Sequence, residues 1–331
     1  MNRVPAGQGR HVRPQPTGES PVTIEVTGLL AQPAATQVLA LAEAATDHDP
    51  VSPLSEHVLL QLRYGGDPQA RNLLLTQDGV LAGYAHLDPA DPAEGPSGEL
   101  VIHPAHRRQG LGVALTRAML AEAGSRPLRL WAHGDLPGAG ALAARAGFGR
   151  LRALWTMRRS LQAPLDTPRF PAGVTARTFV VGQDEAAWTE LNRRAFAHHP
   201  EQGTWTLEDL LLREREPWFD PAGFFLAERP GKLAGFHWTK IHRARPGGPP
   251  HGQEAIGEVY VVGVDPAERG TGLGRALTLE GLRYLRSRGL LEVMLYVDES
   301  NTPAIRLYES LGFSHRDTDV MYRHPPLDSG D

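Results

Sequence analysis

The chain has 331 residues, of which 41% are apolar and 22% charged, so it is long enough for two globular domains of ordinary size. A net charge of −4 gives no electrostatic basis for binding nucleic acid or an acidic membrane, and no apolar run approaches the ~20 residues that span a bilayer. Cysteine is absent, which excludes disulfides, thiolate metal sites and a cysteine nucleophile, and with no signal-peptide core near its start the chain is expected to be a cytoplasmic protein.

The first half of the chain opens with a polar tail over residues 1–20, rich in Pro, Gly and Arg, which we expect to be disordered. A turn at Asp78-Gly79 predicts a hairpin. The expected elements are, in chain order, helices over 36–46 and 54–63, strands over 71–76, 79–86 and 98–102, a helix ending near 124, a strand over 127–133, a helix over 138–146 and a strand near 149–159. Residues 160–173 have the composition of a linker.

The second half repeats this order of elements. The expected elements are a strand over 174–179, helices over 184–198 and 206–215, strands over 223–228 and 233–241, a flexible loop over 243–254, a strand over 257–264, a helix over 272–288, a strand over 290–297, a helix over 302–310 and a strand over 317–323. Thr206-x-Glu208 resembles a helix cap. Mixed strands and helices in this order predict an α/β fold, with a mixed, partly antiparallel sheet flanked by helices in each half.

One unusual loop occurs twice. Residues 103–116 read HPAHRRQGLGVALT and residues 265–278 read DPAERGTGLGRALT; the copies lie 162 residues apart and are identical at nine of fourteen positions. Each follows an apolar run, opens a helical pattern and precedes a Gly-Phe turn. Self-similarity at this period predicts two copies of one domain. We expect a tail over 1–20, an N-terminal domain over 21–160, a linker over 161–173, a C-terminal domain over 174–325 and a tail over 326–331.

The repeated loop has the features of a pyrophosphate site. Its glycines permit positive φ and a close approach, the helix that follows contributes its N-terminus, and Arg107, Arg108 and Arg269 add charge. It is not a Walker loop, because Gly-Lys-Ser/Thr is missing, nor a dinucleotide fingerprint, because the third glycine is missing. The simpler alternative is a tight strand-to-helix turn, which two copies with matching flanks disfavour.

The Arg-x-x-Gly-x-Gly loop resembles the signature of the GNAT N-acetyltransferase superfamily. The resemblance implies two tandem GNAT domains that use acetyl-CoA as co-substrate. It also implies that the loop holds the pyrophosphate, and that the preceding strand splays away from its neighbour and binds the pantetheine arm.

Acid–base side chains distinguish the two copies. Glu258 in the second copy aligns with Pro96 in the first, or with Glu99 if a strand bulge shifts the comparison, and Tyr308 aligns with Ala143. A carboxylate can take the proton that an attacking amine must lose, and a tyrosine can donate one to the departing thiolate. We therefore expect the second domain to be catalytic, with Glu258 as base and Tyr308 as acid. Glu258 as an arginine-paired carboxylate and Tyr308 as a core residue are the alternatives.

Further stretches resemble the mycothiol synthase family, a two-domain branch of that superfamily, over about residues 36–323. They are VSPLSEHVL at 51–59, LWAHG at 130–134, HPEQGTWT at 199–206, WFDP at 218–221, GFHWTK at 235–240, GEVYVVGVDP at 257–266 and LYVDESN at 295–301. The resemblance implies acetylation of the cysteinyl amine of cysteinyl-glucosaminyl-inositol by a monomer that needs no metal. An acetyltransferase of another small amine or peptide N-terminus, and a non-catalytic acetyl-CoA-binding protein, stay open as alternatives.

The same resemblance implies which residues bind the two substrates. The thiol-sugar would contact Glu56, Glu201, Lys240 and Glu258. The reactive acetyl-CoA would contact Val262, Gly263, Val264, Arg269, Gly270, Thr271, Gly272, Leu273, Gly274, Arg275, Tyr296, Asn301, Thr302, Pro303, Ala304, Ile305 and Arg306. A second CoA in the first domain would contact Leu100, Val101, Ile102, Arg107, Arg108, Gln109, Gly110, Leu111 and Gly112. Gly270 and Thr271 stand where that loop commonly has bulkier, basic residues.

Overall fold

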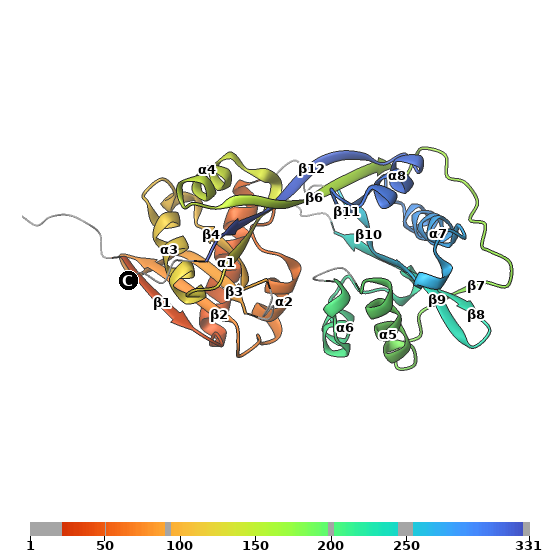
Figure 1. Ribbon diagram of the computed structural model, residues 1–331, viewed down its shortest axis with the longest axis horizontal. Coiled ribbons are helices and arrows are strands. Elements are labelled where there is room, and N and C mark those ends of the chain that lie inside the picture. The colour runs from red at the N-terminus through yellow and green to blue at the C-terminus, as the bar shows by residue number, and fades with distance from the viewer. Residues whose placement is uncertain (1–21, 50, 90–93, 198–201, 244–253, 327–331) are drawn as a thin grey trace, which may run out of the picture.

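The computed structural model describes residues 22–49, 51–89, 94–197, 202–243 and 254–326 (Figure 1). The predicted tails over 1–20 and 326–331 lie outside these ranges except for residue 326, as do residues 244–253 of the predicted loop and the candidate substrate residue Glu201. Within the described ranges, no helix is long and apolar enough to cross a membrane.

Every predicted helix and strand in the described ranges is present, with small shifts in its ends. The first half contains β1 (Val22–Thr27), α1 (Gln32–His48), α2 (Glu56–Tyr64), β2 (Arg71–Gln77), β3 (Val80–Asp88), β4 (Ser97–Ile102), α3 (Leu111–Ala123), β5 (Leu128–Ala132), α4 (Pro137–Arg145) and β6 (Gly149–Ser160). The second half contains β7 (Thr175–Thr178), α5 (Glu185–Ala195), α6 (Leu207–Glu214), β8 (Phe224–Arg229), β9 (Lys232–His242), β10 (Ile256–Val264), α7 (Leu273–Ser287), β11 (Glu292–Asp298), α8 (Thr302–Ser310) and β12 (Ser314–His324).

Local signals explain most element ends. Asp78 and Gly79 both have positive φ, at 53° and 79°, which a two-residue turn between β2 and β3 requires. Thr206 caps α6 as expected, but its partner in the capping box is Asp209 rather than Glu208, because the third helical position is the one that reaches back to the cap. Strand β1 was not predicted; it is an edge strand with largely exposed residues, so its burial pattern carries little signal.

The twelve strands of the described residues form one sheet in which the two halves exchange their last strands. The strand order is β1-β2-β3-β4-β5-β12-β6-β11-β10-β9-β8-β7. β12 pairs antiparallel with β5 of the first half, and β6 pairs antiparallel with β11 of the second half. β6 and β12 also pair with each other. In Figure 1 these two long strands run along the top of the molecule and join its two lobes.

Each exchanged strand also contributes side chains to the core of the other half. Met157 and Leu161, from β6 and just after it, are buried with Leu295 and Phe313 of the second half. Tyr322 of β12 packs against the core formed by the first half, and the ring of His324 lies 5.1 Å from that of Phe148. The exchange therefore makes each core depend on residues from both halves.

Helices cover both faces of the sheet in each half. In the first half, α1 and α2 pack on one face and α3 and α4 on the other, with residues of β2 alternating between the two cores. In the second half, α7 and α8 cover one face, and α5 and α6 cover the other through an aromatic core around Trp188 and Trp238. This is the α/β architecture predicted from the sequence, with helices on both sides of a mixed sheet.

Candidate active site

A splay between two parallel strands opens the sheet in each half, as the family resemblance implied. β10 pairs with β11 only from Gly257↔Val293 to Val259↔Leu295, so residues 260–264 diverge from β11. β4 pairs with β5 only at Ser97↔Arg129 and Gly98↔Leu130. Beyond these points, the strand before each glycine-rich loop has one edge that is not used in the sheet, and such an edge can pair with an extended ligand.

The second glycine-rich loop leads from the splay into the N-terminus of α7. Gly270 and Gly272 have φ of +78° and +88°, and Gly272 is the N-cap of the helix. No heavy atom outside the chain neighbours lies within 4 Å of where a Cβ would stand at either glycine. The loop therefore presents backbone N–H groups and a helix N-terminus to open space, the arrangement that binds a pyrophosphate.

Ion pairs brace the start of this loop from behind. Asp265, which is buried, accepts from Arg194 Nε at 3.2 Å and pairs with Lys232 Nζ at 3.0 Å. Arg229 forms a two-bond pair with Glu268 at 2.6 and 3.0 Å. Burial alone would raise the pKa of Asp265, but the hydrogen bond from Ala267 N–H and the contacts with Lys232 and Arg194 outweigh it and lower the pKa. The loop is thus held by carboxylates that stay ionised at neutral pH.

The first loop has the same backbone but uses its arginine differently. Gly110 has φ of +82° and caps α3, as Gly272 caps α7. Arg107 donates two hydrogen bonds to the Asp49 carboxylate, at 2.6 and 2.9 Å, and a third to the Ile102 carbonyl at 3.1 Å. The guanidinium expected to face a phosphate is therefore engaged with the end of α1.

Three of the residues predicted to bind the thiol-sugar, Glu56, Lys240 and Glu258, lie together between the two halves. Lys240 Nζ donates to Glu56 Oε1, which joins β9 of the second half to α2 of the first. Tyr260 donates to the other oxygen of Glu56 at 2.5 Å, and Arg213 Nε donates to the Tyr260 hydroxyl at 2.7 Å. Burial would raise the pKa of Glu56, but Lys240 and Tyr260 outweigh it and the pKa is lowered. Glu56 is therefore ionised, and it is already held in place by Lys240 and Tyr260 of the other half.

Aromatic rings form the walls around this cluster. Lys240 Nζ lies 4.5 Å from the centre of the Trp218 ring and 5.0 Å from that of Tyr260. The Arg213 guanidinium stacks 3.8 Å above Trp205. Rings attract cations to their faces through the π system, so these contacts help to fix the positions of Lys240 and Arg213.

Glu258 lies beside this cluster on β10. It is directly opposite Lys240 in the antiparallel β9–β10 ladder, so the two side chains share one face of the sheet. Glu258 is only 5% exposed, and its Oε2 accepts from His242 Nε2 at 2.6 Å. The predicted alternative was a carboxylate paired with arginine; among the described residues, the partner of Glu258 is instead the histidine His242.

Tyr308 lies on the opposite face of the sheet from Glu258. Its ring is 7% exposed and packs in the core with Val259, the residue that follows Glu258 and points the other way. Its hydroxyl makes no hydrogen bond to another described residue, and burial raises its pKa to about 12. Since β10 and β11 separate just after Val259, a thioester inserted in the splay could be reached from both faces.

The strand pairing corrects the alignment of the two copies. A bulge at Tyr260 shifts the second copy by one residue relative to the first. Met294 of β11 and Arg129 of β5 occupy equivalent positions in the two copies. Met294 is paired with Glu258, and Arg129 is paired with Ser97. The counterpart of Glu258 is therefore Ser97, neither Pro96 nor Glu99, because a one-residue bulge moves the comparison by one position and not by three.

The remaining predicted acetyl-CoA residues line the same end of the second half. Tyr296 lies on β11 and is half exposed, next to the edge that leaves β10. Asn301 caps α8 by accepting from Ala304 N–H at 3.2 Å, and residues 302–306 form the first turns of that helix. Arg275 is paired with Asp166 of the linker at 2.8 Å and with Ser310 at 2.9 Å. Of the residues predicted to bind acetyl-CoA, Arg275 thus contacts the linker and α8, whereas Tyr296 and Asn301 lie near the end of β11 that leaves β10.

Three residues at the site were not predicted from the sequence: His242, Tyr260 and Arg213. A signal existed for His242, because it follows Lys240 by two residues on the same strand and so lies on the same face. No comparable signal identified Arg213 or Tyr260, whose contacts depend on how α6 and the β10 bulge pack. Among the described residues, no group of three or more histidine, aspartate and glutamate side chains is placed to hold a metal ion.

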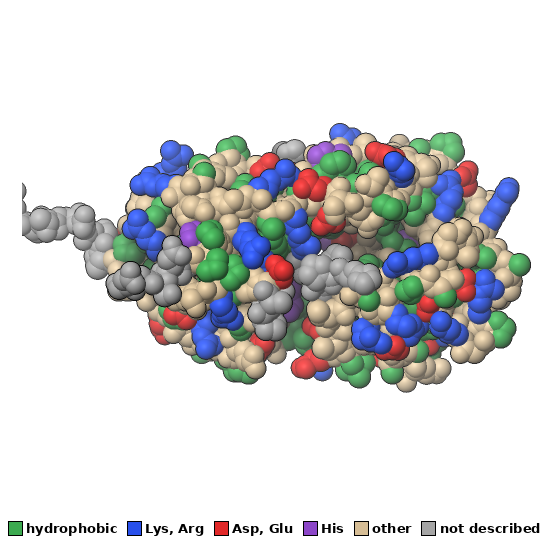
Figure 2. Space-filling view, viewed as in Figure 1, with side chains coloured by type: hydrophobic (Ala, Val, Ile, Leu, Met, Phe, Trp, Pro, Cys, Tyr) green, Lys and Arg blue, Asp and Glu red, His purple; other side chains and the backbone are tan. Residues whose placement is uncertain are grey.

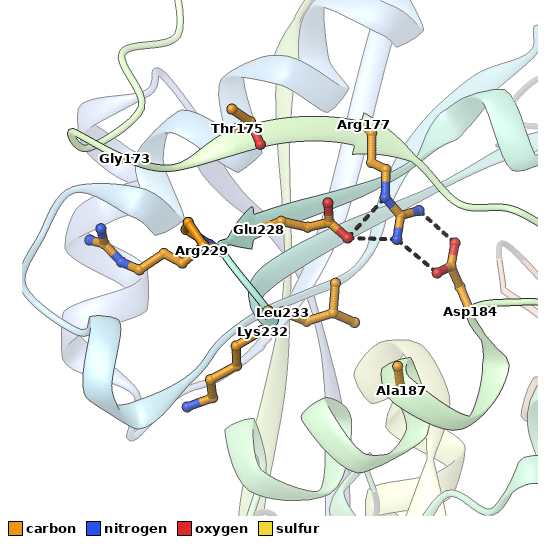
Figure 3. A pocket seen from close by; sticks show the side chains of 11 residues that line it. Gly173, Thr175, Arg177, Asp184, Ala187, Glu228, Arg229, Lys232 and Leu233 are labelled. Atoms are coloured by element: carbon orange, nitrogen blue, oxygen red, sulfur yellow. Dashed lines mark hydrogen bonds and ion pairs between the residues drawn. The ribbon is translucent and has the colours of Figure 1, made fainter.

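A separate hollow of about 480 Å³ lies at the outer edge of the sheet, on β7, β8 and β9 (Figure 3). Arg177 crosses it and donates to both Asp184 and Glu228 at 2.6–2.9 Å. Arg229 and Lys232, also at its rim, are paired with Glu268 and Asp265. The basic side chains of this hollow are thus neutralised within the protein, and the hollow is remote from Glu258.

Comparisons with known proteins agree with this geometry. The acetyltransferase (GNAT) family matches the chain twice, over residues 38–148 and 186–313. A tandem GNAT protein from the clavulanic acid biosynthesis pathway has the same fold, with a TM-score of 0.69 and 24% identity over 92% of this chain and all of that one. A GCN5-related N-acetyltransferase from Sphaerobacter thermophilus is 27% identical, with a TM-score of 0.59, over 92% of this chain and 97% of that chain. The fold and the site therefore define an acetyltransferase enzyme with two GNAT repeats.

Relatives with higher sequence identity identify a specific group within the acetyltransferases. A mycothiol acetyltransferase from Thermobispora bispora is 64% identical over 288 residues, 86% of this chain and 94% of that protein. Another, from Thermomonospora curvata, is 61% identical over 298 residues, 90% of this chain and 96% of that protein. The chain belongs to the GNAT acetyltransferase family and, within it, to the mycothiol acetyltransferases.

Proposed function

We propose that this enzyme transfers the acetyl group of acetyl-CoA to the cysteinyl amine of cysteinyl-glucosaminyl-inositol, the last step in making mycothiol. The observation that carries the proposal is the cluster of Glu56, Lys240 and Glu258 beside the β10–β11 splay. Two carboxylates and an ammonium, walled by aromatic rings, suit an acceptor that has many hydroxyls and one amine, because charge-assisted hydrogen bonds orient such a molecule strongly. The relatives named mycothiol acetyltransferase support the same acceptor.

Acetyl-CoA fits the second splay and loop. The open glycines at 270 and 272 leave room for a pyrophosphate at the N-terminus of α7, and the unused edge of residues 260–264 is long enough for an extended arm. We propose the same role for the first loop and residues 100–102, with Arg107 bracing the loop through Asp49. Because the position of Glu258 is occupied there by Ser97, the first repeat would bind CoA without catalysing transfer.

Glu258 would remove the proton that the acceptor must lose. An α-amino group has a reference pKa of about 7.7–8.0, so much of it is protonated at neutral pH and cannot attack. Glu258 would accept that proton, and His242, whose ring reaches toward solvent, would hold the carboxylate in place during the transfer. The amine lone pair then forms the C–N bond as the C–S bond of the thioester breaks.

Tyr308 would supply a proton to the departing thiolate. Its raised pKa, about 12, keeps the hydroxyl protonated over the whole working range, as an acid requires. The chemistry consists of proton transfer and nucleophilic attack by the amine, and the proposal includes no metal. We further propose that the enzyme acts as a monomer in the cytoplasm, with catalysis in the second half and CoA binding in the first, each half completed by the strand that it receives from the other.

The test is to incubate the purified full chain with acetyl-CoA and two acceptors: cysteinyl-glucosaminyl-inositol and the same compound with its thiol methylated. Tandem mass spectrometry would locate the acetyl group. We expect an amide on the cysteinyl nitrogen in both cases, because the amine attacks directly. No amide from either acceptor would refute the proposed reaction, and an amide from the free thiol alone would show that acetyl passes through sulfur and that Glu258 does not act on the amine.

A further inference from the structure

A buried acid–base–acid cluster lies where the two halves exchange strands. It consists of Glu99 on β4, His133 just after β5, and Asp319 on the exchanged strand β12. His133 Nδ1 lies 3.0 Å from Asp319 Oδ2, and its Nε2 lies 3.6 Å from Glu99 Oε1. Asp319 also accepts from Gly134 N–H at 2.8 Å. Glu99 is 5% exposed and Asp319 9%, so these charges are largely removed from water.

The cluster carries a net negative charge that His133 offsets in part. Burial would lower the pKa of His133, but its contacts with Asp319 and Glu99 outweigh burial and raise the pKa to about 10. Burial would likewise raise the pKa of Glu99, which His133 and the Ser55 N–H instead hold below its usual range. Buried ion pairs add little to stability compared with apolar packing, so their presence here calls for another explanation.

The second oxygen of Glu99 contacts the start of α2. Glu99 Oε2 accepts from Ser55 N–H at 2.7 Å, and Ser55 is the N-cap of α2, with its hydroxyl accepting from Val58 N–H at 3.5 Å. A carboxylate at this point accepts from a backbone N–H that would otherwise lack a partner, and its negative charge is stabilised by the positive end of the helix dipole. The residue after the cap is Glu56, the carboxylate that reaches Lys240 and Tyr260 in the other half.

We propose that Glu99 is a positioning residue for the acceptor site: it fixes the N-terminus of α2, and thereby holds Glu56 across the gap between the halves. The inference rests on the proposed function for the assignment of Glu56 to acceptor binding. His133 contacts Glu99, and Asp319 contacts His133. Asp319 lies on the exchanged strand β12, so a strand from the second half helps to position Glu56 of the first half, which binds Lys240 in the site.

Three variants test this anchor. Glu99→Ala removes the acceptor of the Ser55 N–H, whereas Glu99→Gln keeps an oxygen in its place. Ser55→Pro removes the same bond from the other side, since the Ser55 φ of −66° suits proline and proline has no N–H. Asp184→Ala is the control, because Asp184 is a buried carboxylate that pairs with Arg177 at the far edge of the sheet.

We expect Glu99→Ala and Ser55→Pro to raise the KM for the thiol-sugar roughly tenfold, the scale of a lost hydrogen bond to a charged group, with the KM for acetyl-CoA unchanged. Glu99→Gln should stay within about threefold of the wild type, and Asp184→Ala should change melting temperature but neither KM. In a Glu56→Gln background, Glu99→Ala should add little, because both changes disable one contact. The inference would be overturned if the KM for acetyl-CoA rose as much as the KM for the thiol-sugar, or if the effects of Glu56→Gln and Glu99→Ala were additive.

Hydrogen exchange of the free protein gives a readout that does not depend on the acceptor. The amides of residues 55–58 should exchange faster in Glu99→Ala than in the wild type, and the amides of α1 should not. If the wild type failed to acetylate the thiol-sugar while this local change occurred, the proposed function would fail and the anchor would stand. Unchanged exchange at 55–58 and an unchanged KM in an active enzyme would refute the anchor itself. If Glu99→Ala did not fold, Ser55→Pro would decide through the two KM values and not through exchange, because it also removes the Ser55 hydroxyl that accepts from Val58 N–H.

Discussion

Glu258 and Tyr308 lie on opposite faces of the sheet, and their surroundings differ in polarity. Glu258 lies among polar partners, Lys240 across the ladder and His242 in hydrogen-bond contact. Tyr308 lies in an apolar core with Val259 and Phe313. Burial raises the pKa of Tyr308 and keeps its hydroxyl neutral, as a proton donor must be, whereas Glu258 has the polar neighbours that suit a proton acceptor.

Replacing Glu258 with glutamine should lower the rate roughly 10²–10⁴-fold, the usual range for a lost general base. The loss should shrink as pH rises through the pKa of the acceptor amine, because a neutral amine needs no base. Profiles of kcat/KM against pH for both proteins would measure this. A pH dependence identical in wild type and variant would move the base elsewhere, with Glu201 and His242 the next candidates.

Tyr308→Phe keeps the ring and its packing but removes the proton donor. We expect kcat to fall while the KM for acetyl-CoA and the melting temperature change little. Since burial raises the pKa of Tyr308 to about 12, the wild type should show no loss of rate from this residue below pH ~11. Steady-state kinetics and thermal unfolding of the variant test this; normal kcat with a weakened fold would make Tyr308 a packing residue.

Some of these residues could be predicted from the sequence, and others could not. Glu56, Lys240 and Glu258 lie in recognisable stretches, and the structure brings all three together. His242 was not predicted, although it follows Lys240 by two residues on the same strand and therefore shares its face. Glu99 was considered only as a counterpart of Glu258, a reading that the bulge at Tyr260 overturns, since bulges depend on packing that the local sequence does not encode.

At the scale of elements, the two glycine-rich loops are close structural copies. Gly110 and Gly272 cap their helices with φ of +82° and +88°, and open space surrounds both. Repeated elements of this kind are predictable, because positive φ favours glycine and the helix that follows has a clear period. The loops differ in what lies upstream: only the second follows a strand that carries a carboxylate at the position of Glu258.

These matched glycines allow a controlled comparison. Gly272→Glu and Gly110→Glu impose the same backbone strain and add the same charge in equally open surroundings, so their effects on folding should be similar. Gly272→Glu should abolish turnover by blocking the pyrophosphate site, and Gly110→Glu should leave substantial turnover. Both would be assayed at saturating acceptor after melting temperatures are compared. If Gly110→Glu abolished turnover and Gly272→Glu did not, the first repeat and not the second would be the catalytic one.

At the scale of the whole molecule, the exchanged strands join two repeats into one sheet. Basic and acidic side chains are interspersed over the face seen in Figure 2, in keeping with the small net charge. The exchange was not predicted, because β6 and β12 each read as an ordinary last strand of their own half. Local periodicity shows that a strand exists but not which neighbour it pairs with, and the two repeats offer nearly equivalent partners.

Cutting the chain in the linker should not separate the halves. A protease site inserted near residue 168 would break the connection between β6 and β7, but β6 would stay between β11 and β12. We expect the cleaved halves to elute together under native conditions, to keep acetyl transfer, and to separate only in denaturant. Halves that separate on a native size-exclusion column would show that the exchanged pairing does not hold the molecule together.

The central claim is that the cluster between the halves selects one amine. It is tested most directly by measuring kcat/KM of the purified enzyme with acetyl-CoA and a panel of acceptors: cysteinyl-glucosaminyl-inositol, glucosaminyl-inositol without cysteine, free cysteine, a polyamine and a short peptide. We predict that the complete thiol-sugar will exceed every other acceptor by a wide margin, because only it carries a cysteinyl α-amine that extends beyond the sugar to Glu258 while the sugar hydroxyls contact Glu56 and Lys240. Equal or faster turnover of the polyamine or the peptide would contradict the account.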